Sequence, residues 1–371
     1  MESPECINNF NLYYKNLFEW TLIFYNKKRT REIYRGNKKD NSKFTVIIKK
    51  IKVENNYQQI LKEIYFLACC RKCDYFIKLV DLFLSEDKKF IFLVLKDEGV
   101  SLNALLSKII NNEGDDYTTI EDTIKWIVFQ IVCGLFILHK NNLVHNDIKP
   151  DNILISRVGK VKIGDFGSVD KTETKGLGTI YYQSPDILLG KESTEKDDMW
   201  GVGVIMVELY KKKFPFFNFN EFSKQNNVKN YEKLFQLKSI LSKYKICINN
   251  NIVNTSGTNH FYFIKNHVLK ANCYNNFKAE LNMNNIEEIK DIEALDLINN
   301  LLNLNPTKRF DAKQALDSKY LSKYKNAFQQ CSISFNQNDY ENLITNVPDE
   351  NVFLKNVEII REKFIGEVIF E

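Results

Sequence analysis

From about residue 20 to residue 95 the hydrophobic pattern favours strands around a single helix. β-Branched and aromatic residues partly alternate with polar ones there, which is typical of half-buried strands. The expected strands cover residues 44–53, 76–84 and 90–95, with a polar turn at 85–89. One segment differs, because apolar residues recur at steps of three and four over residues 57–70 and predict a helix.

Beyond Gly99 the pattern becomes helical. The expected helices cover residues 101–111, 118–139, 198–212 and 291–304. The longest apolar run, Trp126 to Leu138, is interrupted by Gln130 and is typical of a helix buried in a protein core. No run of about 18 apolar residues occurs, so no membrane-spanning helix is expected. A small β-rich part followed by a mostly helical part indicates the α+β class.

Composition adds limits on size and partners. The chain has 371 residues, of which 44% are hydrophobic, enough for a large core in one two-lobed domain or two domains. Its 52 basic and 47 acidic residues are interspersed and leave a net charge of +5. Because a surface this mixed is usually only solvated, we expect neither a nucleic-acid nor a membrane partner.

Cysteine usage indicates a reducing compartment. The eight cysteines show no repeating spacing, which favours reduced thiols in the cytosol or nucleus. Cys69, Cys70 and Cys73 form a cluster, but no second ligand pair has matching spacing, so buried cysteines are favoured over a zinc site. Residues 1–10 lack a secretory signal pattern. We therefore expect an intracellular protein of the cytoplasm, the nucleus or both.

Two short segments carry the candidate chemistry. The first, residues 145–152, offers the carboxylate of Asp147, the cation of Lys149 and the amide oxygen of Asn152. The second places the carboxylate of Asp165 two residues before a flexible Gly167. Phosphoryl transfer requires a group that orients the attacking hydroxyl, oxygen ligands for Mg²⁺, and positive charge for the phosphoryl oxygens. These segments contain all three kinds of group.

The two segments resemble the catalytic loop and the metal-binding loop of eukaryotic protein kinases. The resemblance implies a bilobal kinase fold with ATP and Mg²⁺ as cofactors. It implies that Asp147 orients the substrate hydroxyl and accepts its proton, and that Lys149 is the cation found in serine/threonine-specific kinases. Asn152 and Asp165 would be the Mg²⁺ ligands. The implied organisation is an N-terminal extension 1–19, an N-lobe 20–95, a C-lobe 96–325 with an insert at about 217–290, and a C-terminal extension 326–371.

The resemblance extends to the nucleotide site. Lys49, in the sequence Val-Ile-Ile-Lys, resembles the strand lysine that holds the α- and β-phosphates, and Glu63 resembles the acid that pairs with it. By spacing, Leu95 is the residue expected at the back of the adenine pocket. Lys96, Asp97 and Glu98 would then form the hinge that contacts the nucleotide.

Downstream motifs support the same comparison. Residues 178–186 resemble the segment that supports the substrate peptide, with Thr179 placed to hold its hydroxyl near Asp147. Asp186 stands where kinases usually have Glu, and Arg309 is its expected partner in a buried ion pair. Asp198 resembles the aspartate that braces the backbone of the catalytic loop.

The sequence departs from the family at the nucleotide-covering loop. The three glycines of that loop should precede the strand ending at residues 32–34, and Asn26, Lys28 and Arg31 stand in their places. Glycines let backbone amides approach phosphate closely, so their loss predicts weak nucleotide binding or a different clamp. Lys28 and Arg31 could bind the nucleotide through their side chains. The alternative is a solvated basic turn that contacts nothing.

A second departure concerns regulation. Asn146 stands where most regulated kinases have an Arg that binds a phosphorylated activation loop. The loop between Gly167 and Ser184 is also short, at 16 residues. We therefore predict that the loop is arranged constitutively and that phosphorylation of Thr172 or Thr174 adds little.

Further features indicate a subfamily. Residues 188–190 and the insert resemble the cyclin-dependent and mitogen-activated kinase group, although Gln183 replaces the Arg that shapes that group's pocket for proline. The combination is similar to the monomeric fungal kinases that activate cyclin-dependent kinases. The resemblance thus implies a monomeric enzyme with a protein substrate, such as a cyclin-dependent kinase. The alternative is a catalytically weak or inactive scaffold that binds nucleotide and a partner. Separately, residues 326–371 could dock on the body or bind a partner, but a C-terminal packing segment is favoured.

Overall fold

The chain forms two compact units. The computed structural model describes residues 12–28, 30–41, 44–54, 56–111, 117–172, 174–175, 178–212, 214–216, 232–248, 251–253, 277–281, 289–345 and 347–366. Unit 1 contains residues 1–99, 164–167 and 331–371, and unit 2 contains residues 100–163 and 168–330. Most of the predicted insert at 217–290 lies outside the described residues.

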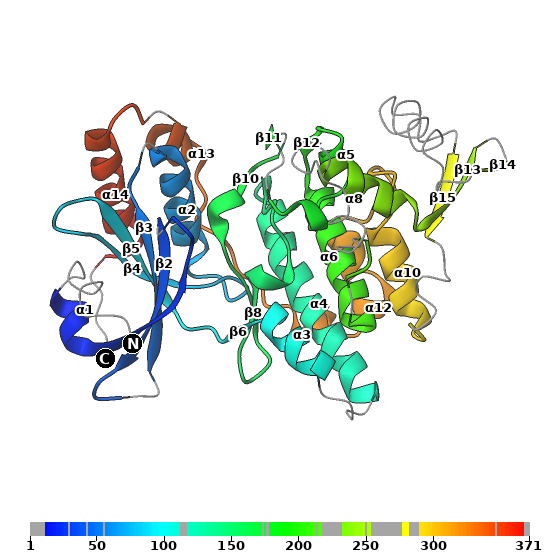
Figure 1. Cartoon of the computed structure of the whole chain (residues 1–371), viewed down its shortest axis with the longest axis horizontal. Coiled ribbons are helices and arrows are strands. Elements are labelled where there is room, and N and C mark those ends of the chain that lie inside the picture. The colour runs from blue at the N-terminus through cyan, green and yellow to red at the C-terminus, as the bar shows by residue number, and fades with distance from the viewer. Residues whose placement is uncertain are drawn as a thin grey trace. The chain divides into compact units, whose positions relative to one another are not determined.

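Unit 1 is built around a five-stranded antiparallel sheet with the strand order β1-β2-β3-β5-β4 (Figure 1). Its strands are β1 (Phe18–Tyr25), β2 (Arg31–Lys38), β3 (Thr45–Lys52), β4 (Leu79–Leu84) and β5 (Phe90–Lys96). Its helices are α1 (Leu12–Leu17), α2 (Tyr57–Cys70), α13 (Gln337–Tyr340), the π-helix η9 (Glu341–Thr345) and α14 (Glu350–Phe364).

The two faces of this sheet have different roles. In β3 the side chains alternate, so that Val46 and Ile48 enter a hydrophobic cluster with Tyr14 of α1 and Phe92 of β5. Lys49 lies on the opposite face, where α2 places Glu63 against it. The sheet is therefore a central layer with α1 on one side and α2 on the other.

Unit 2 is mostly helical. Its helices are α3 (Leu102–Asn111), α4 (Tyr117–His139), α5 (Pro185–Leu188), α6 (Glu195–Lys211), α8 (Glu232–Leu241), α10 (Ile292–Leu301), α11 (Ala312–Leu316) and α12 (Lys319–Ser322). Its strands are β6 (Val100–Ser101), β7 (Leu143–Val144), β8 (Ile153–Ile155), β9 (Val161–Ile163), β10 (Asp170–Lys171), β11 (Thr174–Lys175), β12 (Glu192–Ser193), β13 (Tyr244–Ile248), β14 (Asn251–Val253) and β15 (Phe277–Leu281). Its short 3-10 turns are η2 (Pro150–Asn152), η4 (Ile180–Tyr182) and η8 (Lys325–Ala327), whereas η3 (Phe166–Ser168) begins in the unit 1 segment 164–167.

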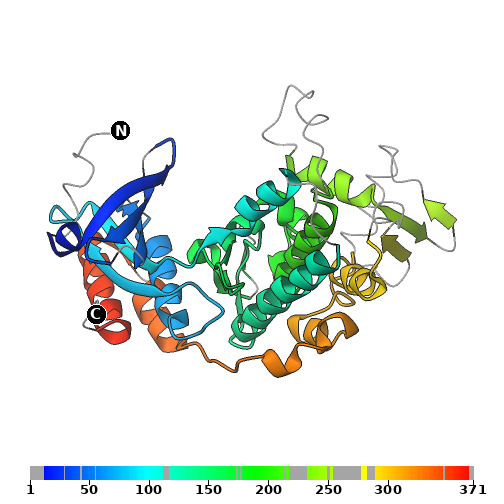
Figure 2. The ribbon, with the colours of Figure 1, turned by 90° about the horizontal axis from the view of Figure 1, so that it is seen from below.

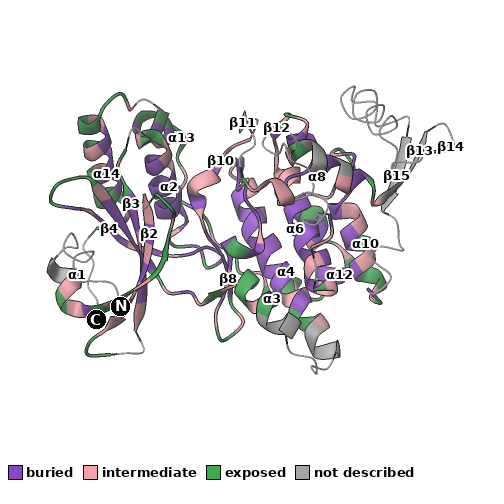
Figure 3. Cartoon of the chain, viewed as in Figure 1, coloured by how far each residue is buried: buried purple, intermediate pink, exposed green. Residues whose placement is uncertain are grey.

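Helix α4 forms the centre of unit 2 and is largely buried (Figure 3). Its segment Glu121–His139 is long and apolar enough to cross a membrane by composition, but 67% of its most apolar stretch is buried inside the structure. Burial to this extent is typical of a helix in a protein core. Gln130 interrupts the apolar run and is itself buried, donating to the backbone oxygen of Gly159 at 3.0 Å and accepting from the N–H of Val161 at 3.0 Å.

Helix α6 begins at a well-formed capping box. The Thr194 side chain and the carboxylate of Asp197 each satisfy a backbone N–H of the first turn. Acidic residues in this turn lie favourably at the positive end of the helix dipole. The helix ends at Lys212, which adopts a left-handed backbone conformation with φ 51°. The capping box fixes where Asp198, the next residue, enters the core.

Two sequence predictions are corrected by the structure. The strand expected to end at residues 32–34 is β2, which begins at Arg31 and continues to Lys38, because its alternating burial extends that far. The cysteines are not all reduced, since Cys73 and Cys331 form a disulfide across a Cα–Cα distance of 5.4 Å. Their partnership joins positions 258 residues apart, so no local spacing could indicate it.

Candidate active site

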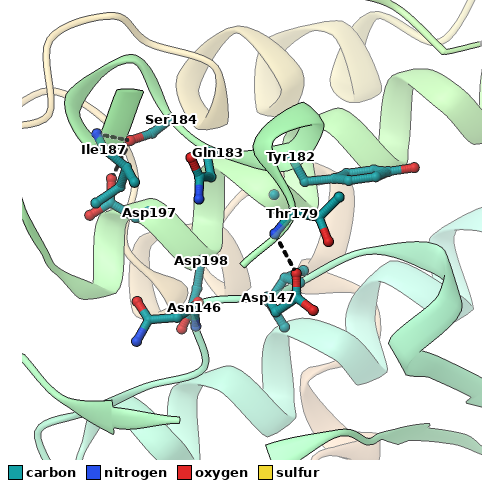
Figure 4. A pocket seen from close by; sticks show the side chains of 11 residues that line it. Asn146, Asp147, Thr179, Tyr182, Gln183, Ser184, Ile187, Asp197 and Asp198 are labelled. Carbon is teal, nitrogen blue, oxygen red and sulfur yellow. Dashed lines mark hydrogen bonds between the residues drawn. The ribbon is translucent and has the colours of Figure 1, made fainter. Parts of the chain in front are cut away.

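Asp147 lies in unit 2, in the loop between β7 and η2, and its carboxylate is held by three donors. The Lys149 Nζ lies 2.7 Å away, the Asn152 Nδ2 lies 3.0 Å away, and the backbone N–H of Thr179 donates at 2.8 Å. Figure 4 shows the last of these contacts, with the Asp147 carboxylate pointing toward Thr179. The spacing of Lys149 and Asn152 from Asp147 is local, whereas Thr179 comes from a separate segment.

The same contacts keep Asp147 ionised. Burial alone would raise the pKa of its carboxyl group, but the hydrogen bond and charge of Lys149 and the bond from Thr179 outweigh that effect and lower the pKa below its ordinary value. Asp147 is therefore a carboxylate at neutral pH. Lys149 also donates to the Thr179 hydroxyl at 2.7 Å, so one cation contacts both groups.

Asp198 fixes the backbone that precedes Asp147. Its carboxylate accepts the N–H of His145 at 2.8 Å and the N–H of Asn146 at 2.9 Å, and it lies 2.8 Å from the His139 Nε2. Asn146 has a φ of 67°, a left-handed conformation that Asn tolerates better than most residues. Its side-chain amide donates to the Ser168 backbone oxygen at 3.0 Å.

A second group of predicted residues meets in unit 1. The Lys49 Nζ forms a hydrogen-bonded ion pair with Glu63 and lies 3.2 Å from the Asp165 carboxylate. Burial lowers the pKa of Lys49, but the two carboxylates outweigh it and raise that pKa above its ordinary value. Lys49 is thus a cation at neutral pH with a carboxylate on each of two sides.

Asp165 belongs to unit 1 because the chain leaves unit 2 after β9 and returns at Ser168. Its φ of 57° is unusual for a non-glycine residue, and such backbone strain clusters at functional sites. The next residue, Phe166, is fully buried and packs edge-on against Phe76 at a centroid distance of 5.7 Å. Phe166 therefore anchors the segment that carries Asp165.

The predicted hinge follows β5. Leu95 is buried and pairs with Ile47 of β3, and Lys96 is exposed. Glu98 is buried, and within the described part of the chain its Oε1 has no hydrogen-bond partner. A buried carboxylate oxygen in that condition suits a site that receives a ligand donor.

The β1–β2 hairpin contains the residues that replace the expected glycines. Asn26 closes its turn, since its side-chain oxygen accepts the N–H of Thr30 at 2.8 Å and of Arg31 at 3.2 Å. The positive charge of Arg31 acts on Lys49 and opposes the rise in its pKa. Lys28 is exposed at the hairpin tip. Of the two proposed cationic contacts, Arg31 is thus the one whose charge is felt at Lys49.

The expected ion pair between Asp186 and Arg309 is confirmed. The Arg309 Nη2 lies 2.8 Å from the Asp186 Oδ2, and Arg309 is fully buried. The guanidinium also lies 3.4 Å from the Asp197 carboxylate and 5.2 Å from the Trp200 ring. Asp186, although one methylene shorter than Glu, thus reaches its partner.

Comparison with known proteins agrees with this geometry. The protein kinase domain model matches residues 30–321. This chain belongs to the protein kinase family. It is 28% identical to serine/threonine-protein kinase ppk23 of Schizosaccharomyces pombe over 78% of this chain and 68% of the relative. It is 32% identical to serine/threonine-protein kinase SSN3 of Candida albicans over 76% of this chain and 46% of the relative.

A third relative is extracellular signal-regulated kinase 2 of Dictyostelium discoideum, 26% identical over 78% of this chain and 75% of the relative. These relatives place the chain with the serine/threonine kinases and agree with the cyclin-dependent-kinase-like group indicated by residues 188–190. The α+β kinase fold predicted from the sequence is confirmed, with a β-sheet lobe and a helical lobe.

The residues of this kinase fit ATP with Mg²⁺. Asn152 uses its amide NH₂ on Asp147, which leaves its oxygen as the atom able to ligate a cation. Asp165 supplies a carboxylate. Within the described residues no group of three His, Cys, Asp or Glu residues forms a metal cage. Mg²⁺ is usually bound by one or two protein oxygens together with substrate phosphates, and the Asn152 amide oxygen and the Asp165 carboxylate are each a donor of that kind.

The sequence missed two features of the kinase site. It gave Thr179 a role through its hydroxyl, but not through the backbone N–H that holds the Asp147 carboxylate. It also gave no role to Gly178, whose φ of 100° turns that N–H toward Asp147. The signal was present in the Gly-Thr pair, since a glycine before a candidate site residue often marks a special backbone conformation.

Proposed function

We propose that this chain transfers the γ-phosphoryl group of Mg²⁺–ATP to a serine or threonine hydroxyl of a protein substrate. The observation that carries the proposal is the Asp147 carboxylate, kept ionised and oriented by Lys149 at 2.7 Å and the Thr179 N–H at 2.8 Å. A general base must be charged correctly and lie within hydrogen-bond reach of the proton it accepts. Asp147 meets the first condition.

Each remaining polar residue has a role in this scheme. When bound, ATP supplies the phosphoryl group, and its Mg²⁺ supplies positive charge that neutralises the phosphate oxygens during transfer. Asn152 and Asp165 would hold the cation, and Lys49, oriented by Glu63, would bind the α- and β-phosphates. Lys149 donates to Asp147 and Thr179 and would stabilise negative charge near the acceptor hydroxyl.

We infer that the substrate is another protein kinase of the cyclin-dependent type, phosphorylated on its activation-loop Thr by a monomeric enzyme. Support comes from the cyclin-dependent-kinase-like relationship and from an activation loop that is tied by backbone pairing. Strand β10 pairs with β7, and β11 pairs with β12. The described residues of the loop that make these pairings are held without a phosphate.

A second candidate function is a nucleotide-binding scaffold with little catalysis. The β1–β2 hairpin favours it, because Asn26 closes the turn where kinases usually present glycine amides to phosphate. The ionised Asp147 and the paired Lys49 favour the enzyme, since a scaffold has no use for a charged catalytic base.

The test is transfer of radiolabelled phosphate from Mg²⁺–ATP to a basic protein and to an unphosphorylated cyclin-dependent kinase. We expect transfer to the second substrate, lost by a factor of about 10² or more in Asp147→Asn. Asp122→Asn, on an exposed side chain of α4, is the matched control and should keep full activity. Transfer to the basic protein alone would remove the proposed substrate. No transfer to either, with ATP still raising the melting temperature, would support the scaffold.

A further inference from the structure

Residues 331–366, here called the C-terminal brace, belong to unit 1 and pack along α2 (Figures 1 and 2). We propose that the brace is a positioning element for catalysis: it holds α2 where Glu63 pairs with Lys49. The chain would thereby supply from its own C-terminal part the support that α2 needs, without a second protein on this face. The proposal rests on the proposed kinase function, because it concerns how the Lys49–Glu63 pair is kept in place.

Hydrogen bonds to backbone atoms of the brace join it to α2. The Tyr65 hydroxyl donates to the Asn336 backbone oxygen at 2.8 Å and accepts the Asn336 N–H at 3.1 Å. The Ser334 N–H donates to the Cys69 backbone oxygen at 2.9 Å. These three hydrogen bonds fix the position of the brace along the α2 axis, because each involves a backbone atom of the brace.

An aromatic cluster fills the space between α2 and the brace. Tyr65 and Phe66 of α2 contact three aromatic side chains of the brace, with ring centroids 5.7–6.2 Å apart. These side chains are Phe335, Tyr340 and Phe364. Nearer the start of α2, Tyr57 packs on the buried Phe353 of α14 at 5.0 Å. Aromatic packing of this kind contributes beyond its buried area, and it covers both ends of the helix.

Charged groups attach the end of the brace to the rest of unit 1. Arg361 of α14 lies 3.1 Å from the Asp81 carboxylate of β4, which also accepts the Tyr14 hydroxyl at 2.7 Å. Asp81 is buried, so removing a donor would leave its charge poorly compensated. Arg71, just beyond α2, donates to the backbone oxygens of Phe364 and Ile365 at 2.8 and 3.2 Å.

The arrangement of α2 explains how these contacts reach the active site. At about 100° per residue, Glu63 and Tyr65 lie on nearly opposite sides of the helix. The face with Tyr65 meets the brace, while Glu63 meets Lys49 of the sheet. Because a helix behaves as a rigid rod over four turns, losing the brace contacts would let α2 move and would separate Glu63 from Lys49. The Cys73–Cys331 disulfide tethers the first residue of the brace next to α2.

The test severs the brace in the folded protein. A site for a sequence-specific protease is inserted between Gln329 and Gln330, whose side chains are exposed, and a scrambled insert of equal length is the control. After cleavage the disulfide retains the brace, and reductant followed by gel filtration removes it. We expect removal to lower kcat by about 10²-fold, since misplacing a phosphate-binding group by about 1 Å can have that effect. Adding back a peptide of residues 331–371 should restore it.

A double-mutant comparison separates positioning from general stability. If the brace acts through Glu63, removing it from a Glu63→Gln protein should lower kcat only slightly further. An equal fold-loss in both backgrounds would indicate a merely structural role and would overturn the proposal. An unchanged kcat after the brace is gone would also overturn it.

A milder variant tests the same contact without cleavage. Tyr65→Phe keeps the aromatic packing and loses both bonds to Asn336, so kcat should fall while the melting temperature changes little. If the intact protein transfers no phosphate, the proposed function fails. Hydrogen exchange still tests whether the brace holds α2 in position. Its removal should then speed exchange in α2 and not in β3, and equal exchange in α2 before and after removal would refute it.

Discussion

Gly178 lies against the catalytic loop so closely that a Cβ at this position would be 2.1 Å from the Asn146 backbone oxygen and 3.0 Å from the Asp147 carboxylate. Its φ of 100° is also one that side chains rarely adopt. Both facts have one consequence. Only glycine lets the chain bring the Thr179 N–H to within 2.8 Å of Asp147.

Gly178→Ala should therefore reduce activity strongly. The new Cβ would push residues 178–179 away from the catalytic loop, so kcat/KM should fall by about 10²-fold. Gly190→Ala is the matched control, since Gly190 has a φ of 85° but a Cβ added there would meet nothing within 4 Å, so it tests backbone strain alone. Equal activity of the two variants in a steady-state assay would contradict the close-approach argument.

The pH dependence should follow the lowered pKa of Asp147. The Lys149 ammonium is a main cause of that lowering, so Lys149→Met should raise the pKa and move the acid limb of the kcat/KM profile to higher pH. The lowered pKa of Asp147 also fixes the direction in which its contribution to folding stability changes with pH. A carboxylate whose folded pKa is depressed stabilises the fold above its unfolded pKa, and that contribution disappears as pH falls through the folded pKa. An acid limb that stays in place in Lys149→Met would contradict this assignment.

The buried ion pair between Asp186 and Arg309 should be important for stability. Arg309→Met removes the buried partner of the Asp186 carboxylate and leaves it only the partly exposed Lys191 among the cations that pair with it in the described residues, so the free energy of unfolding should fall by about 3–5 kcal/mol in urea titration. Lys323→Met breaks an exposed pair with Asp122 and should leave the free energy of unfolding nearly unchanged, because water and salt screen exposed charges. Comparable losses of unfolding free energy in the two variants would show that burial does not determine how much each ion pair contributes to stability.

Activity should not require phosphorylation of the activation loop. Its backbone is tied by the pairing of Thr174 with Ser193 and by the Thr172 N–H, which donates to the Asn142 oxygen at 3.1 Å. The double variant Thr172→Ala/Thr174→Ala should therefore keep kcat/KM within about twofold of the parent protein, since the pairing is made by backbone atoms that both substitutions keep. Loss of activity in a variant that retains its melting temperature would refute this prediction.

Arg31 should contribute to nucleotide affinity. Its charge acts on Lys49, so Arg31→Ala should raise KM for ATP by about tenfold, as expected for one charge-assisted contact of about 1.4 kcal/mol. Lys28→Ala removes an exposed cation from the same hairpin and serves as the matched comparison for the change in KM. A KM for ATP that is unchanged in both variants would favour the solvated-turn interpretation and leave nucleotide binding to Lys49.

The sequence by itself determined features whose physical cause is local. Apolar residues at helical steps predicted a helix over residues 57–70, and α2 has those bounds. Asp147, Lys149 and Asn152 lie within six residues, so their meeting in one loop follows from their spacing. The α+β class followed from the change in hydrophobic period, and the kinase resemblance followed from motif residues.

The tertiary structure decided every relationship between distant segments. Lys49 and Asp165 lie 116 positions apart, and Tyr65 and Asn336 lie 271 apart, so no pattern of neighbouring residues encodes either contact. The same holds for Cys73 and Cys331, which the composition alone predicted to be reduced. Propensity and periodicity act over one or two turns of chain, whereas these pairings depend on how the sheet, α2 and the brace pack together.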